Sequence, residues 1–136
     1  MDVTKIPFIR KIGIGKADDG RLVLSSDSTN QNHINTLHAS AQFALAETSS
    51  AEALQTLFPD LEGKVVPVLR DSQVKYRKPT VHSVSAFASV EDAAREKFIA
   101  QFERKGRAAI AVSVDVVDAE DVVTCTGVFN WFVQSL

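Results

Sequence analysis

Hydrophobic and polar positions divide the chain into segments of clearly different periodicity. From Ala39 to Leu57 there is no glycine or proline, and small or apolar side chains cover nearly every face of the first two turns. This pattern predicts a long buried helix whose small side chains let a sheet pack closely. One acidic residue, Glu47, lies in its middle. A carboxylate in such a place is costly unless it is hydrogen-bonded, paired or at a wet cleft, so Glu47 is the first candidate for function.

Two shorter amphipathic segments predict further helices. Residues 4–11 fit a short helix that Gly13 would end, and residues 89–105 carry apolar positions at helical spacing. Gly106 follows directly, where a glycine commonly ends a helix. The central helix should end just before Pro59, because a proline disfavours helical backbone in the residue before it.

Alternating and valine-rich segments predict about five or six strands. An Asp-Gly pair at residues 19–20 is a strong hairpin signal between the first two. Because regular helical crossovers do not separate the strands, the pattern favours an antiparallel sheet with helix packed on it, the α+β class. The length of 136 residues fits one domain over residues 1–136. The predicted strands are residues 12–17, 21–26, 64–78, 81–90, 107–117 and 122–133.

Composition and charge exclude several classes of function. The formal net charge of −2 gives no support to nucleic-acid binding, and no stretch is long and apolar enough to span a membrane. The charged first residues do not resemble a signal peptide. A single cysteine, Cys125, fits a reducing compartment, so we expect a cytoplasmic protein.

The spacing of Asn32, His38 and Glu47 resembles a known motif. The run NHINTLHAS, followed by a helix with an acidic residue, is similar to the motif of hotdog-fold acyl-CoA thioesterases, especially the PaaI-like group. The order of elements is similar over nearly the whole chain. The resemblance implies a hotdog fold, in which an antiparallel sheet of five to six strands wraps around a long central helix. Three positions that are usually glycine in the family are occupied here by Asn35, Ala39 and Ser40.

Thioester hydrolysis requires a base or nucleophile and a donor to the carbonyl oxygen. The resemblance implies the first role for Glu47. The N–H groups of Ala39 and Ser40, at the start of the helix, can polarise a carbonyl, helped by the helix dipole. Asn32 would position the water or the thioester, and His38 would donate a hydrogen bond that fixes the loop. Each side chain also has a structural alternative: Glu47 as a hydrogen-bonded carboxylate at a dimer seam, Asn32 as a tie within the loop, and His38 as a structural histidine.

A basic cluster, formed by Arg104, Lys105 and Arg107, surrounds Gly106. It has two interpretations. The cations can favour the end of the preceding helix through its dipole. Alternatively, they can bind the coenzyme A phosphates, to which the corresponding region of the family contributes.

Helix geometry adds a constraint on the site. Eight residues separate Ala39 from Glu47, which is about 12 Å at ~1.5 Å per residue, so one thioester carbonyl does not reach both on the same helix. Two antiparallel helices from two subunits could bring them together, and the resemblance implies sites at a dimer interface. We therefore expect a homodimer, or a homotetramer built as a dimer of dimers. We expect no cofactor and no metal ion, since no second ligand lies at metal-binding spacing from His38.

Three functions are compatible with these features. The first is an acyl-CoA thioesterase. The second is a non-catalytic hotdog module that binds acyl-thioesters or another apolar ligand, which the missing glycines favour. The third, a hotdog dehydratase or hydratase, fits least, because His38 and Glu47 do not match the catalytic arrangement associated with those enzymes.

Overall fold

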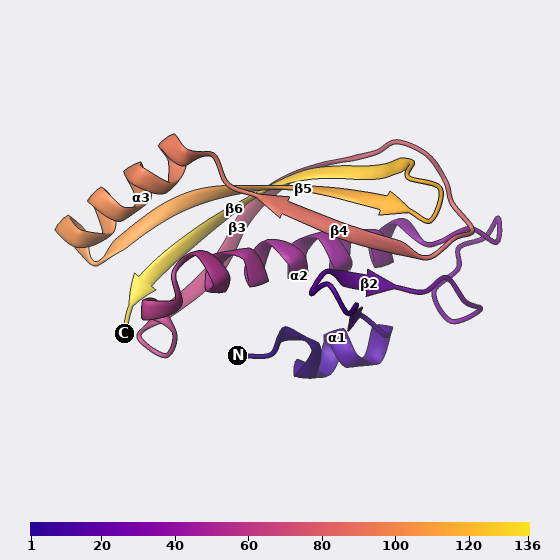
Figure 1. The fold of residues 1–136 in the computed structure, drawn as a ribbon, viewed down its shortest axis with the longest axis horizontal. Coiled ribbons are helices and arrows are strands. Elements are labelled where there is room, and N and C mark those ends of the chain that lie inside the picture. The colour runs from indigo at the N-terminus through magenta and orange to yellow at the C-terminus, as the bar shows by residue number, and fades with distance from the viewer.

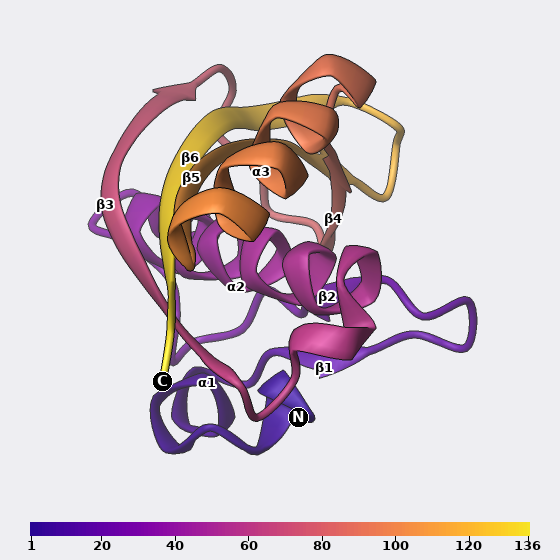
Figure 2. The same ribbon diagram turned by 90° about the vertical axis from the view of Figure 1, so that its left-hand side faces the viewer.

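The computed structural model describes residues 1–136, and its central feature is one long helix wrapped by a six-stranded sheet (Figure 1). All neighbouring strands are antiparallel, and α2 (Ala39–Leu57) packs against the inner side of β4, β5 and β6. The strands are β1 (Gly15–Lys16), β2 (Leu22–Leu24), β3 (Val65–Tyr76), β4 (Val84–Ser89), β5 (Arg107–Asp118) and β6 (Val123–Ser135), in the spatial order β1-β2-β4-β5-β6-β3. Figure 2 shows the sheet curving over α2. The predicted α+β class and hotdog architecture are confirmed.

The predicted helices are present, with changes at their starts. The central helix has the predicted bounds. The first segment is divided into a 3₁₀ turn (Val3–Lys5) and α1 (Pro7–Ile12), because proline is preferred in the first turn of a helix. Helix α3 (Asp92–Lys105) begins three residues later than expected, and a second 3₁₀ turn (Pro59–Leu61) follows α2. Gly13 and Gly106 end their helices in the left-handed conformation, with φ of 85° and 69°.

The N-terminal strands are much shorter than predicted. Ile12 belongs to α1 rather than to a strand. Strand β1 contains only two residues, and β2 contains three. The Asp-Gly turn is nonetheless confirmed: the Ala17 N–H donates to the Arg21 carbonyl (2.8 Å), and β1 pairs with β2. The segment 81–83 lies before β4 rather than in it. In β3 the pairing with β6 shifts between Leu69 and Asp71.

Two buried polar bonds fix α2 on the sheet. In the first turn of the helix, the Thr124 hydroxyl donates to Gln42 Oε1 (2.7 Å), and two turns later the Trp131 indole N–H donates to Ser50 Oγ (2.8 Å). Buried polar groups must be paired in this way, so each bond also sets the rotation of α2 about its axis. Strands β4 and β5 also pack against the helix, and alternate residues of β5 are buried. None of the helices combines the length and the hydropathy that crossing a membrane would need.

Strand β3 leaves one long edge of the sheet open. It pairs only with β6 and lies at the end of the strand order, so one edge of its 12 residues forms no ladder. Val66 and Val68 on this strand are 47% and 51% exposed. A long edge strand with exposed apolar side chains is a template for pairing with another chain.

Candidate active site

His38 is the N-cap of α2. Its backbone is extended (φ −64°, ψ 137°), and its ring Nδ1 accepts a hydrogen bond from the Ser40 N–H (2.9 Å). The neutral ring therefore carries its proton on Nε2. The His38 backbone N–H donates to the Asn30 carbonyl (2.8 Å), which ties the loop to the helix start. The expected loop-fixing hydrogen bond comes from the backbone, while the ring stabilises the first turn of the helix.

Only one of the two expected free N–H groups is free. The Ser40 N–H is not free, because it donates to the His38 ring. The N–H of Ala39 has no hydrogen-bond partner in the chain, as expected for the first residue of a helix. The start of α2 thus offers a single backbone donor, at the positive end of the helix dipole.

Asn32 is engaged within its own loop. Its Oδ1 accepts from the N–H groups of Ile34 and Thr36 (both 3.0 Å), and its Nδ2 donates to Thr36 Oγ1 (2.8 Å). These bonds favour the alternative in which Asn32 ties the loop. Asn35 has a φ of 61°, the left-handed conformation that glycine adopts freely and asparagine tolerates. The residue that replaces a family glycine therefore retains a glycine-like backbone.

Glu47 is half-buried and has no partner. No hydrogen bond or ion pair within the chain reaches its carboxylate. Burial raises the pKa of Glu47 above the ordinary glutamate range. In the alternative role, Glu47 would be a structural carboxylate that accepts hydrogen bonds. No donor within the chain forms such a bond.

The environment of Glu47 contains residues that the sequence did not single out. One turn earlier on α2, Phe43 packs edge-on against Phe129 of β6, with ring centroids 5.6 Å apart. One turn later, the Ser50 hydroxyl donates to the Glu47 carbonyl (2.6 Å) and accepts from Trp131. The turn of helix that carries Glu47 is thereby fixed to the sheet. Helical spacing from Glu47 would have identified Phe43, but the contact with Trp131 depends on the packing of β6.

The basic cluster lies far from the start of α2. Arg104 and Lys105 end α3 and Arg107 begins β5, and none of the three forms an ion pair. At the other end of β5, Val116 lies beside Thr124, which bonds to Gln42 in the first turn of α2. Nine residues of strand separate Arg107 from Val116, about 30 Å. The structure therefore brings Asn32, His38, Ala39 and Ser40 together near the start of α2. It places the basic cluster at the opposite end of β5.

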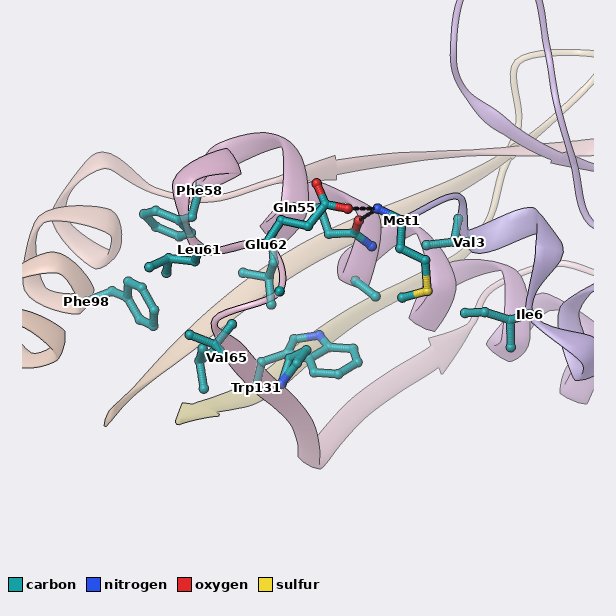
Figure 3. Close-up of a pocket in the computed structure, with 15 residues that line it drawn as sticks. Met1, Val3, Ile6, Gln55, Phe58, Leu61, Glu62, Val65, Phe98 and Trp131 are labelled. Carbon is teal, nitrogen blue, oxygen red and sulfur yellow. Dashed lines mark hydrogen bonds and ion pairs between the residues drawn. The ribbon is translucent and has the colours of Figure 1, made fainter. Parts of the chain in front are cut away.

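An apolar cavity of about 520 Å³ opens beside the C-terminal half of α2 (Figure 3). Its walls come from α2, α3, β3, β6 and the N-terminal segment. Ala51 and Leu54 of α2 line it, together with Trp131 of β6 and Phe98 of α3. The cavity thus adjoins the turn that carries Glu47.

The structure shows neither a cluster of metal-binding side chains nor an accessible thiol. The structure gathers no group of three or more His, Cys, Asp or Glu side chains that could hold a metal ion. Cys125 is buried, and burial raises the pKa of its thiol to about 11. Its thiol is therefore a poor nucleophile at neutral pH.

The chain matches one known protein family over nearly its whole length. A family model described as a domain of unknown function (DUF4442) matches residues 4–133. A search among curated proteins finds no match to the sequence.

Solved structures share the fold. A Pseudomonas aeruginosa protein described as a probable thioesterase has a TM-score of 0.79 at 17% identity, over 98% of this chain and 91% of that one. A Haemophilus influenzae thioesterase has a TM-score of 0.77 at 19% identity, over 98% and 87%. A Bacillus halodurans protein solved with coenzyme A has a TM-score of 0.70 at 20% identity, over 90% and 72%. At these identities the likeness establishes the hotdog fold.

Proposed function

The chain belongs to the DUF4442 family and has the hotdog fold found in thioesterases, and from this premise we propose that it is an acyl-CoA thioesterase with Glu47 as its base or nucleophile. One observation carries the proposal: Glu47 is a half-buried carboxylate without a partner, in the middle of the central helix. Such a group is costly to keep, and a raised pKa of this kind is typical of catalytic acids and bases. The coenzyme A bound to the Bacillus halodurans structure supports the substrate class.

The proposed reaction divides the work between two groups. As a base, the Glu47 carboxylate takes a proton from a water molecule whose oxygen bonds to the thioester carbon. As a nucleophile, it bonds to that carbon itself, and water then hydrolyses the anhydride. In both forms the C–S bond breaks and the sulfur leaves as a thiolate. It takes up the proton that Glu47 removed from water in the first form, and a proton from the hydrolysing water in the second. The free N–H of Ala39 donates to the oxygen on which negative charge develops.

This division requires two subunits. Ala39 and Glu47 lie about 12 Å apart along one helix, so a single carbonyl reaches both only if they come from different chains. Antiparallel α2 helices in a homodimer would place one chain's Ala39 beside its partner's Glu47. The same arrangement would move a basic cluster toward the α2 N-terminus of the opposite chain. The open edge of β3 supports such an assembly.

We expect the protein to sediment at micromolar concentration with at least twice the mass of one chain. The physical reason is that the free edge of β3 and its exposed valines need a partner. Analytical ultracentrifugation measures this directly. A stable monomer that still hydrolyses acyl-CoA would contradict the two-subunit site.

The basic cluster gives a second expectation. Reversing two of its charges, as in Arg104→Glu with Arg107→Glu, should raise KM for acyl-CoA roughly fivefold or more and leave kcat nearly unchanged, because phosphate contacts hold ground and transition states alike. The KM of the unaltered protein should also rise with salt. Arg95→Glu with Lys97→Glu, earlier on the same helix, is the matched control. An unchanged KM, with a small acyl thioester for comparison, would leave only the helix-end role for the cluster.

One observation favours the alternative, a hotdog module that binds thioesters without turnover. Because His38 occupies the Ser40 N–H, the helix start offers one donor where the sequence suggested two. Steady-state hydrolysis of a panel of acyl-CoAs, measured beside a Glu47→Ala variant, separates the two functions. Turnover that disappears in the variant supports the enzyme. Binding of acyl-CoA without turnover in the unaltered protein supports the module.

A further inference from the structure

The apolar cavity begins on the same face of α2 as Glu47. Ala51, Leu54 and Phe58, which line it, follow Glu47 by four, seven and eleven residues. At 3.6 residues per turn these positions stay within about 40° of Glu47 around the helix. Glu47 does not itself line the cavity, but a group attached to a carbon held at Glu47 would lie on the side of the helix where the cavity begins one turn later.

The walls of the cavity are mostly apolar, and the two charged groups among its lining residues, the Met1 ammonium and the Glu62 carboxylate, form an ion pair with each other. Phe58 packs on Phe98 of α3 with ring centroids 4.7 Å apart, and both rings line the cavity beyond the C-terminal end of α2. Val3 and Ile6 of the N-terminal segment form the side opposite these aromatic rings (Figure 3). Of the 15 lining residues 11 are hydrophobic, so the cavity favours a hydrocarbon over a polar or charged group.

The dimensions fit an extended chain. Leu54 and Phe58 lie about 10 Å and 16 Å beyond Glu47 along the helix axis. An extended chain advances roughly 1.2 Å per bond, since the three backbone bonds of a residue span at most ~3.6 Å, so this distance holds roughly 8 to 13 carbons. A volume of 520 Å³ lies within the range of known ligand pockets, about 300–1,000 Å³.

We propose that this cavity binds the straight aliphatic acyl chain of the substrate, with the carbonyl near Glu47 and the far end of the chain against Phe58 and Phe98. The position of the carbonyl rests on the proposed thioesterase function, while the binding of an aliphatic chain rests on the cavity alone. The acyl chain then runs toward the C-terminal end of α2. The α2 N-terminal side is left for the coenzyme A part, toward which a dimer would bring the partner's basic cluster.

Trp131 provides a direct readout of binding. It is the only tryptophan in the sequence and lines the cavity. Titrating the protein with acetyl-, hexanoyl-, decanoyl-, dodecanoyl- and hexadecanoyl-CoA, and separately with decanoate, should change its fluorescence. Each methylene added inside the cavity should lower Kd roughly threefold to fourfold, because burial removes it from water. The gain should stop beyond roughly 13 carbons, where the chain reaches the aromatic rings.

Two substitutions on α2 form a matched pair. Ala51→Phe places a ring in the cavity one turn from Glu47 and should raise Kd for decanoyl-CoA at least tenfold, with little effect on acetyl-CoA. Ala53→Phe makes the same change about 200° around the helix, where Ala53 lines a separate hollow of about 400 Å³, and should leave both Kd values unchanged.

The outcomes distinguish this proposal from the proposed function. Affinity that does not depend on chain length, or equal effects of the two phenylalanine variants, would overturn the acyl site even if thioesters are hydrolysed. A change in sedimentation caused by Ala51→Phe but not by Ala53→Phe would also overturn it, since a second copy of the chain would then fill the cavity. Chain-length-dependent binding without hydrolysis of any thioester would uphold the acyl site and reject the thioesterase.

Discussion

Glu47→Gln should lower kcat at least ~100-fold, the lower end of the loss expected when a general base is removed. Glutamine keeps the shape of the side chain but cannot accept a proton from water or attack a carbonyl. Since no residue of the chain is paired with this carboxylate, the variant should fold, assemble and bind acyl-CoA as the unaltered protein does. Stopped-flow or steady-state hydrolysis, with Kd from Trp131 fluorescence, separates kcat from binding.

The pH dependence follows from the direction of the Glu47 pKa shift. Burial raises this pKa, and the ionised form is the reactive one, so activity should fall as pH decreases through a pKa above the ordinary glutamate range. The stability of the fold should change with pH in the opposite direction to the activity. A folded-state pKa above the unfolded one means that the ionised form disfavours folding, so stability should rise as pH falls through the folded pKa. At neutral pH Glu47→Gln should therefore be no less stable than the unaltered protein.

The matched control is Glu52→Gln on the same helix. Glu52 forms an ion pair with Lys16 (2.8 Å) and lines the hollow on the other side of α2, so its loss should leave kcat unchanged. If Glu47→Gln is instead fully active, or loses stability while each folded dimer keeps its activity, then Glu47 is a structural residue. Thermal unfolding of both variants and assays normalised to folded dimer decide between these results.

Ala39→Pro should lower kcat by roughly 10² to 10³, the effect of removing one oxyanion donor. Proline has no N–H, yet it is favoured at the first position of a helix. His38 already has the extended backbone that a residue before proline requires, with φ −64° and ψ 137°. Because the Ala39 N–H has no partner in the chain, its loss should leave the fold intact. Ala39→Gly, which keeps the N–H, should retain activity. If Ala39→Pro is also active, the Ala39 N–H does not stabilise the oxyanion.

Mixing the two inactive variants tests the two-subunit site. If one chain supplies the donor and its partner the carboxylate, a mixed dimer of Ala39→Pro and Glu47→Gln contains one intact site of two. Random exchange makes half of the dimers mixed, so about one quarter of the original activity should return. A site built within one chain would give no recovery, since every chain in the mixture carries a defect.

The sequence determined the elements that depend on neighbouring residues. The bounds of α2 followed from a run of helix formers ended by Pro59, and Gly13 and Gly106 end their helices because they adopt a left-handed backbone. The α+β class followed from the periodicity of the strands. Glu47 was identified because an acid among small apolar residues violates the local pattern. Each of these features depends on interactions within a few residues along the chain.

Only the tertiary structure decided the features that depend on distant contacts. The Ser40 N–H is occupied because the His38 ring folds back onto it, and the basic cluster is separated from the helix start because about 30 Å of strand β5 extends between Arg107 and Val116. The raised pKa of Glu47 results from burial, and the cavity forms where segments from both ends of the sequence meet α2. Hydrophobic periodicity specifies which face of an element is buried, but not which distant side chains bury it. Solvent exposure, hydrogen-bond occupancy and cavity shape are therefore set only when the sheet closes over the helix.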